Sequence, residues 1–129
     1  MSGLANKQPI SHLTKDEQIA VIFDRVAAYN QTHDTSKPLF FDTETTGGGR
    51  EDQIIEIAFC DSDRNLIIDT LIYTDRPSSP GAFKVHGIYP HELIGKPTFI
   101  DIQPAIVQLL KGRTLYAYNA SFDVRMMRQ

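Results

Sequence analysis

Apolar residues recur at helical spacing near the start of the chain. Residues 1–13 carry no such periodicity, but Thr14 and Glu17 then form the T-x-x-E pattern of a capping box. The apolar stripe that follows consists of Ile19, Ile22, Phe23 and Val26. Because residues three and four positions apart share one face of a helix, we expect an amphipathic helix that begins at Thr14 and ends near Asn30.

A second helical stripe follows Thr98, which can cap a helix together with Asp101. The stripe consists of Phe99, Ile102, Ile106, Leu109 and Leu110. Pro104 is expected in the first turn of this helix, where a missing N–H costs little, and Gly112 is expected to cap its end.

Four short apolar runs predict β-strands. They cover residues 39–41, 53–60, 66–73 and 114–118. The polar turn between the second and third runs favours an antiparallel hairpin. Residues 82–94 predict one or two short helical turns, and residues 120–128 the start of another helix. This order of elements predicts an α/β fold in which helices flank a mixed sheet.

Composition and charge narrow the function classes. The chain has 129 residues, 41% of them hydrophobic, which suits one domain. A net charge of −3 argues weakly against a passive nucleic-acid-binding module and is compatible with a metalloenzyme. The single cysteine, Cys60, lies in an apolar run and is expected to be a core thiol. With no secretory or membrane-spanning pattern, we expect a cytoplasmic protein without a membrane partner.

Three carboxylates are candidate metal ligands. Asp42 and Glu44 follow the first predicted strand two residues apart, so on a strand they would project to the same face. A divalent cation between them would turn their repulsion into binding; two solvated acids at a strand end are the alternative. Asp123 falls in the first turn of the last predicted helix, where stabilisation of the helix dipole is the alternative to a site.

These residues resemble the motifs of a known family. The segment Phe40–Gly47 resembles the first motif (Asp-x-Glu) of the DEDD 3′→5′ exonucleases, and Tyr118–Asp123 resembles the second (His-Asn-x-x-Phe-Asp). Val85–Ile88 and Pro97–Phe99 are similar to a stretch of the DnaQ-like, proofreading branch of that family. Tyr118 stands where the second motif often has His, a position that does not bind metal.

The resemblance implies a ribonuclease-H-like fold that is incomplete at its C-terminal end. Residues 1–37 would form an N-terminal arm and helix, and residues 38–129 a partial exonuclease domain. The implied activity releases nucleoside monophosphates from the 3′ end of nucleic acid, with single-stranded DNA expected as substrate. Two Mg²⁺ or Mn²⁺ ions are implied, with Asp42 bridging both, Glu44 binding one and Asp123 acting at the second.

The resemblance also implies contacts to the substrate. The segment of Thr43, Thr45 and Thr46 would lie near the terminal nucleotide, and His86 would contact its 3′ end. A loop histidine satisfied by local hydrogen bonds is the alternative for His86. In the second motif, Asn119 would order the backbone around Asp123, and Phe122 would pack beside the site.

The third motif of the family, His-x-x-x-x-Asp or Tyr-x-x-x-Asp, has no match after Asp123, which is followed by six residues. We expect the chain to be a fragment of a longer enzyme with impaired activity. A degenerate relative, or a site completed by a second chain, are the alternatives. An incomplete sheet predicts self-association, for example as a homodimer. A DNA polymerase is a further possible partner, and proofreading, repair and oligonucleotide degradation stay open as roles.

A different class of function also stays open: a non-catalytic nucleic-acid-binding or protein-interaction module that retains the fold. Its local basic cluster would be Arg113, Arg125 and Arg128, for which ordinary solvated arginines are the alternative. The three glycines from Gly47 to Gly49 lack the following Gly-Lys-Ser/Thr of a P-loop. Metal binding at Asp42 and Glu44 would separate the enzyme from this module.

Overall fold

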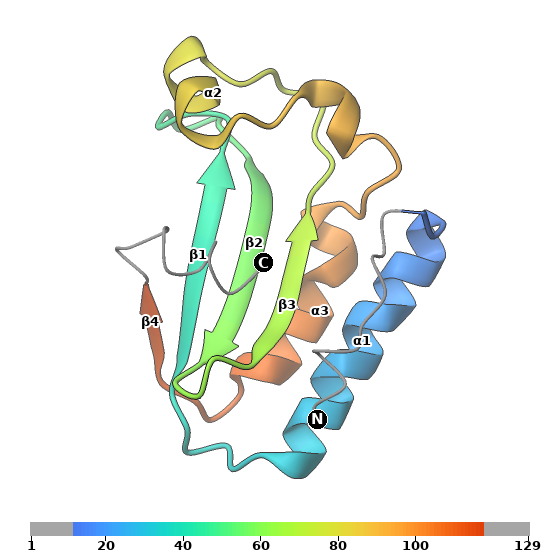
Figure 1. The fold of residues 1–129 in the computed structure, drawn as a ribbon, viewed down its shortest axis with the longest axis vertical. Helices are drawn as coiled ribbons and strands as arrows, with labels where there is room; N and C mark the ends of the chain where they lie inside the picture. Colours follow the sequence, from blue (N-terminus) through green and yellow to red (C-terminus); the bar gives the residue numbers. More distant parts are fainter. Residues whose placement is uncertain (1–11, 118–129) are drawn as a thin grey trace.

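A computed structural model describes residues 12–117. Its four strands are β1 (Leu39–Thr45), β2 (Ile54–Asp61), β3 (Leu66–Leu71) and β4 (Leu115–Ala117). They form one sheet in the order β3-β2-β1-β4, in which β1 pairs antiparallel with β2 and parallel with β4 (Figure 1). The predicted hairpin of β2 and β3 is confirmed as an antiparallel pair. The sheet is therefore mixed, as the order of elements predicts.

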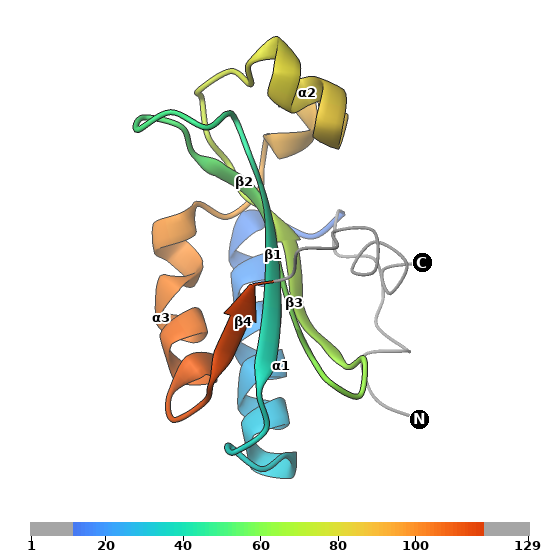
Figure 2. The ribbon, with the colours of Figure 1, turned by 90° about the vertical axis from the view of Figure 1, so that its left-hand side faces the viewer.

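Two helices cover one face of this sheet: α1 (Lys15–Thr32) and α3 (Phe99–Leu110) (Figure 2). Both begin at the predicted capping boxes, Thr14 with Glu17 and Thr98 with Asp101. Their buried side chains join those of the strands in one hydrophobic cluster. The cluster includes Ile22, Val26, Tyr29, Leu39, Ile57, Phe59, Ile68, Ile102, Ala105 and Leu109. Burial of this cluster holds α1, α3 and the sheet together.

The other face of the sheet carries a smaller cluster of Ala58, Cys60 and Leu66, against which Phe40 packs. Cys60 is buried, as its apolar run predicts. Among the described residues, no helix has the length and apolar character needed to cross a bilayer.

Three expectations about element ends are wrong. The first strand does not stop at Phe41, because the ladder with β2 continues to Thr45. The third strand ends at Leu71 rather than at residue 73. Pro104 lies beyond the first turn, as the sixth residue of a helix that begins at Phe99, so its ring removes one backbone hydrogen bond inside α3.

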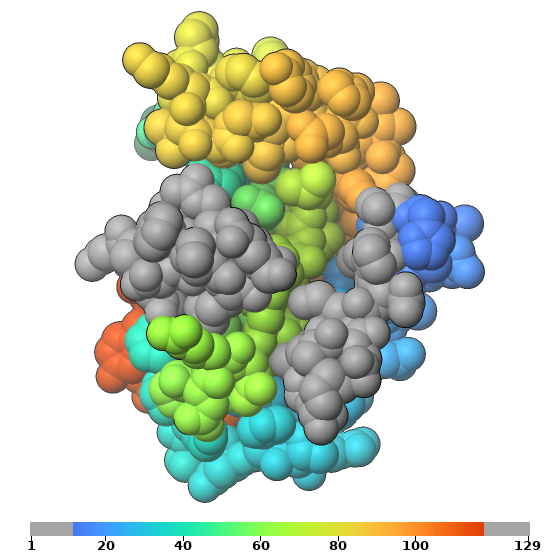
Figure 3. Space-filling view, in the orientation of Figure 1, coloured from blue at the N-terminus to red at the C-terminus, as the bar shows by residue number. Residues whose placement is uncertain are grey.

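A short helix, α2 (Pro80–His86), and a 3₁₀ turn, η1 (Pro90–Leu93), follow β3. Ser79 caps α2, and Gly87 ends it with a φ of 66°, a left-handed conformation that favours glycine. In the space-filling view this segment forms a continuous layer at the end of the molecule toward which β1 and β3 point (Figure 3). The layer brings α2 next to the end of β1.

Candidate functional site

Asp42 and Glu44 lie on β1, on the sheet face opposite α1 and α3. Their neighbour Phe41 packs into the helix-facing cluster, whereas Phe40 packs on the other side, and strand side chains alternate between the two faces. Asp42 is 8% exposed and Glu44 is half-buried. The expected shared face of the two carboxylates is therefore present, and it arises within the strand rather than beyond its end.

A β-bulge follows Glu44 immediately. The ladder pairs Glu44 with Glu56, but Thr45 with Ile54, so one residue of β2 is left over between them. A bulge bends a strand and re-aims its side chains. Here the strand bends where it leaves the carboxylates and enters the glycine-rich turn.

A surface hollow of about 370 Å³ lies between the end of β1 and α2. From the β1 side it is lined by Thr43, Glu44 and Thr45, followed by Gly47 and Gly48. From the α2 side it is lined by Ser79, Gly81, Ala82, Val85 and His86. The fold thus brings four of the predicted site residues, Thr43, Glu44, Thr45 and His86, around one space, although His86 lies about 40 residues further along the chain.

His86 is held by hydrogen bonds on both ring nitrogens. Nδ1 accepts a hydrogen bond of 2.8 Å from the backbone N–H of Ile88, and Nε2 lies 3.0 Å from Ser78 Oγ. Because Nδ1 accepts, the neutral ring carries its proton on Nε2, which then donates to Ser78. His86 therefore makes the local hydrogen bonds that are expected of a loop histidine, and it also lines the hollow.

Thr46 does not line the hollow, because its side chain is fully buried behind the turn. Its hydroxyl donates to Asp52 Oδ1 at 2.7 Å and accepts from the Gln53 N–H at 2.9 Å. Its carbonyl accepts from the Ser79 N–H at 2.7 Å. Thr46 therefore joins the two walls of the hollow, β1 and the start of α2, through its backbone carbonyl, while its side chain binds Asp52 and Gln53.

Asp52 is a residue that the sequence analysis missed. Its Oδ1 accepts from Arg76 Nε at 2.9 Å as well as from Thr46, and its Oδ2 accepts from the Gly49 N–H at 2.7 Å. The hydrogen bond from Arg76, followed by those from Thr46 and Gly49, lowers the pKa of Asp52 to about 2. No motif marks this carboxylate, since two of its three partners, Thr46 and Arg76, are 6 and 24 residues away in the sequence.

Arg113, the described member of the predicted basic cluster, has an internal role. Its guanidinium donates to the carbonyls of Leu109 and Asp34 and to Asn30 Oδ1, and it lies 5.0 Å from the centre of the Tyr29 ring. Arg113 is therefore held by contacts within the protein, unlike an ordinary solvated arginine. Arg125 and Arg128 lie outside the described residues.

The oxygen ligands that this site offers can be compared with those that a divalent cation requires. Asp42 and Glu44 offer carboxylate oxygens, the ligands that hard divalent cations such as Mg²⁺ and Mn²⁺ take. Within residues 12–117, no three His, Cys, Asp or Glu side chains come together as a metal-binding group. Two of the three expected metal ligands, Asp42 and Glu44, therefore lie among the described residues. Asp123, the expected third, lies outside them together with Tyr118, Asn119 and Phe122.

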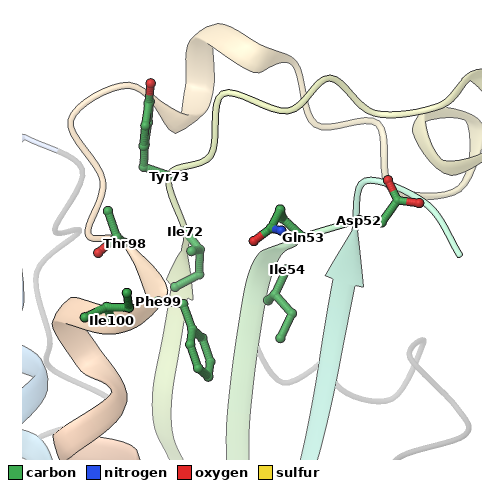
Figure 4. Close-up of a pocket in the computed structure, with 8 residues that line it drawn as sticks. All are labelled: Asp52, Gln53, Ile54, Ile72, Tyr73, Thr98, Phe99 and Ile100. Carbon is green, nitrogen blue, oxygen red and sulfur yellow. The ribbon is translucent and has the colours of Figure 1, made fainter. Parts of the chain in front are cut away.

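A second hollow, of about 310 Å³, opens on the other side of the turn that holds Asp52. Figure 4 shows Asp52 and Gln53 on this turn, with Ile54, Ile72 and Phe99 below them and Tyr73, Thr98 and Ile100 on the far side. None of the predicted site residues lines it. Asp52 therefore lies between the two hollows.

Comparison with known proteins adds an independent observation. A family model described as "Exonuclease" (RNase_T) matches residues 39–129. The chain is 43% identical over 91 residues to the DNA polymerase III subunit epsilon of Treponema pallidum, a match covering 67% of this chain and 42% of that protein. It is 35% identical over 91 residues to an uncharacterized exonuclease of Escherichia phage 186, covering 70% of this chain and 47% of that protein.

Among solved structures, exonuclease I in complex with the inhibitor BCBP is similar, with a TM-score of 0.56 and 26% identity. That match covers 67% of this chain and 22% of the exonuclease I chain. The mixed sheet flanked by helices is thus shared with exonuclease I, whose fold is ribonuclease-H-like. The chain spans less than half the length of these relatives.

Proposed function

The chain belongs to the exonuclease family, and from that premise we propose that it is the part of a 3′→5′ exonuclease that binds catalytic metal and the 3′ end of nucleic acid. One observation carries the proposal: Glu44 belongs both to the carboxylate pair on β1 and to the lining of the hollow beside α2. A nucleotide in that hollow would therefore lie next to the metal ligands.

The exonuclease family generally uses divalent metal ions, and we propose Mg²⁺ or Mn²⁺ at Asp42 and Glu44, with Asp123 as a further ligand. Bound there, a pair of such ions would supply a water nucleophile and neutralise charge on the phosphate. Asp42 is the more buried carboxylate, so a cation would also offset its loss of hydration. Glu44, half-buried at the edge of the hollow, faces both metal and substrate.

The hollow is the proposed site of the 3′-terminal nucleotide. Its β1 wall is formed by Thr43, Glu44 and Thr45, and its α2 wall includes the apolar residues Ala82 and Val85. Such a surface can hold a sugar on one side and pack against a base on the other. His86 would meet the 3′ end with the ring that Ser78 and Ile88 hold in place.

We further propose that the substrate is single-stranded DNA and that a DNA polymerase is a partner. Two of the relatives that support this, from Treponema pallidum and Escherichia coli, carry the name DNA polymerase III subunit epsilon. Proofreading of a newly made 3′ end is the role that such a partner would imply. Self-association of the chain is an additional proposal, because β3 and β4 are edge strands of the described sheet and an edge strand can pair with a second copy.

Mn²⁺ calorimetry on the chain, followed by digestion of an oligodeoxynucleotide, tests the proposal. Wild type and the control Glu51→Gln, which alters an exposed acid on the neighbouring turn, are expected to bind Mn²⁺ alike, whereas Asp42→Asn loses binding. A chain extended at its C-terminus to the length of its relatives is expected to shorten a 5′-labelled oligodeoxynucleotide stepwise from its 3′ end. Wild type without Mn²⁺ affinity, or equal affinity in Asp42→Asn, would favour the interaction module instead.

A further inference from the structure

We propose that Asp52 is a positioning residue of the nucleotide site: its carboxylate fixes the glycine-rich turn that forms one wall of the hollow beside α2. The inference rests on the proposed function, because it assigns that hollow to the 3′ end of nucleic acid. Asp52 itself does not line this hollow, so it acts through the residues that it holds.

The turn is anchored by the Thr45 hydroxyl, which donates to the Gly47 carbonyl at 2.8 Å, and by Asp52. Gly47 and Gly48 line the hollow, and Gly49 follows them, so three consecutive residues lack side chains that could anchor the backbone. Glycine loses more conformational freedom on ordering than any other residue. The Gly49 N–H donates to Asp52 Oδ2 at 2.7 Å, and the Asp52 N–H donates to the Gly49 carbonyl at 3.2 Å. Both contacts tie the turn to Asp52.

The Asp52 carboxylate also lies directly behind Gly47. A Cβ atom added to Gly47 would come within 2.6 Å of Asp52 Oδ2, closer than Cβ atoms approach other atoms in proteins. The backbone of the turn is therefore packed against the carboxylate on the side away from the hollow. Removing or turning that carboxylate would let the wall of the hollow move back.

Arg76 connects the same carboxylate to the opposite wall. It donates from Nε to Asp52 Oδ1 and lies in the segment that leads from β3 to Ser79, the N-cap of α2. The Ser79 N–H in turn donates to the Thr46 carbonyl, and the Thr46 hydroxyl donates to Asp52 Oδ1. Asp52 thus joins the end of β1, the glycine turn and the start of α2, and it sets the separation of the two walls.

The hydrogen bonds described for Asp52 and Thr46 lead to the glycine turn, Gln53, Arg76 and Ser79, whereas the proposed metal ligands Asp42 and Glu44 lie earlier on β1. Loss of the Asp52 carboxylate should therefore weaken binding of the nucleotide while leaving binding of the metal unchanged. A residue with only a general structural role would affect both in parallel.

The test compares wild type, Asp52→Asn and the matched control Glu51→Gln. Glu51 precedes Asp52 in the chain and its carboxylate lies 3.7 Å from Arg76 Nη1, but it does not line the hollow. The probe is a 5′-fluorescein single-stranded oligodeoxynucleotide with a phosphorothioate at its 3′-terminal linkage, which keeps the probe intact. Its dissociation constant is measured by anisotropy with saturating Mn²⁺, and Mn²⁺ affinity is measured by calorimetry.

We expect Asp52→Asn to weaken oligonucleotide binding by about tenfold, the order expected for one lost charge-assisted hydrogen bond. Its Mn²⁺ affinity, and both affinities of Glu51→Gln, should stay within about twofold of wild type. Equal oligonucleotide affinity in wild type and Asp52→Asn, or parallel loss of both affinities, overturns the positioning role. A wild type that binds Mn²⁺ but no oligonucleotide overturns the proposed function and, with it, this inference.

Discussion

The Tyr29 hydroxyl donates a hydrogen bond of 2.7 Å to Asp61 Oδ2, joining α1 to the end of β2 across 32 residues of sequence. Both side chains are buried. Asp61 also accepts from the backbone N–H groups of Asp63 and Asn65 and from the Asn65 side chain, so it organises the turn between β2 and β3. Burial opposes ionisation of Asp61, but these hydrogen bonds outweigh it and its pKa is lowered.

Tyr29→Phe removes this hydrogen bond but keeps the ring that stacks on His33. We expect a loss of about 2 kcal/mol in the free energy of unfolding, because a buried carboxylate loses one donor. Urea denaturation measures the loss, and Tyr73→Phe, at a tyrosine that is largely exposed, is the matched control. An equal effect of the two substitutions would show that the Tyr29–Asp61 bond contributes nothing to stability.

Asp52 makes stability depend on pH in the acid range. Its pKa falls from an ordinary 3.8 to about 2 in the folded protein, so the unfolded chain binds the proton more readily. The stabilisation is present above pH 3.8 and is lost as the pH falls through about 2. In Asp52→Asn, the urea midpoint should decline less steeply across this window than in wild type. Identical slopes would mean that the carboxylate is not tied to Arg76 in solution.

Gly47 and Gly48 should respond differently to the same substitution. The added methyl group of Gly47→Ala meets the Asp52 carboxylate, whereas that of Gly48→Ala meets nothing within 4 Å. We expect Gly47→Ala to lower the free energy of unfolding by about 1–3 kcal/mol through overpacking. Gly48→Ala should be neutral or slightly stabilising, because the unfolded chain loses freedom. Thermal denaturation of the two variants measures the difference, and equal melting temperatures would contradict the packing described for Gly47.

Two valines on the helices form another matched pair. Val26 of α1 is fully buried, and Val107 of α3 is 59% exposed. Val26→Ala should cost about 2 kcal/mol of stability, since two methyl groups leave the core and a cavity remains. Val107→Ala should change stability by less than about 0.5 kcal/mol. If Val26→Ala proved as mild as Val107→Ala in urea denaturation, α1 would not be part of the core in solution.

Glu44→Gln tests whether Glu44 is the second ligand of the proposed metal site. Replacing a carboxylate by an amide removes the charge that a hard cation requires, so Mn²⁺ affinity should fall by at least about tenfold. Calorimetry measures it, with Glu92→Gln as a control at an exposed acid in η1. Unchanged affinity in Glu44→Gln would remove this residue from the site.

Most of the fold followed from the sequence because its signals are local. The capping boxes at Thr14 and Thr98 mark both long helices, and apolar runs mark the strands. The predicted end of β1 was wrong, because the residues from Asp42 to Thr45 are polar and show no strand pattern. They extend the strand only because they pair with β2. Pro104 was misplaced because packing of the α3 face outweighs one missing hydrogen bond.

The sequence predicts those residues of the candidate site that belong to a contiguous motif, but not those that act through contacts distant in sequence. Asp42 and Glu44 stand in one motif, and the predicted residue His86 is brought to the same hollow by the turn between β3 and α2. Asp52 and Arg113 act through contacts distant in sequence, for which spacing gives no signal. The roles of the site residues in metal and substrate binding stay predictions.

The packing of α1 against α3 also orders events during synthesis of the protein. The Gln18 side chain of α1 donates to the Gly95 carbonyl, 77 residues later, and the core partners of Ile22 and Val26 include residues of α3 that follow Gly95. During synthesis α1 therefore precedes α3, and the part of its apolar face that packs on α3 stays uncovered until α3 has been translated.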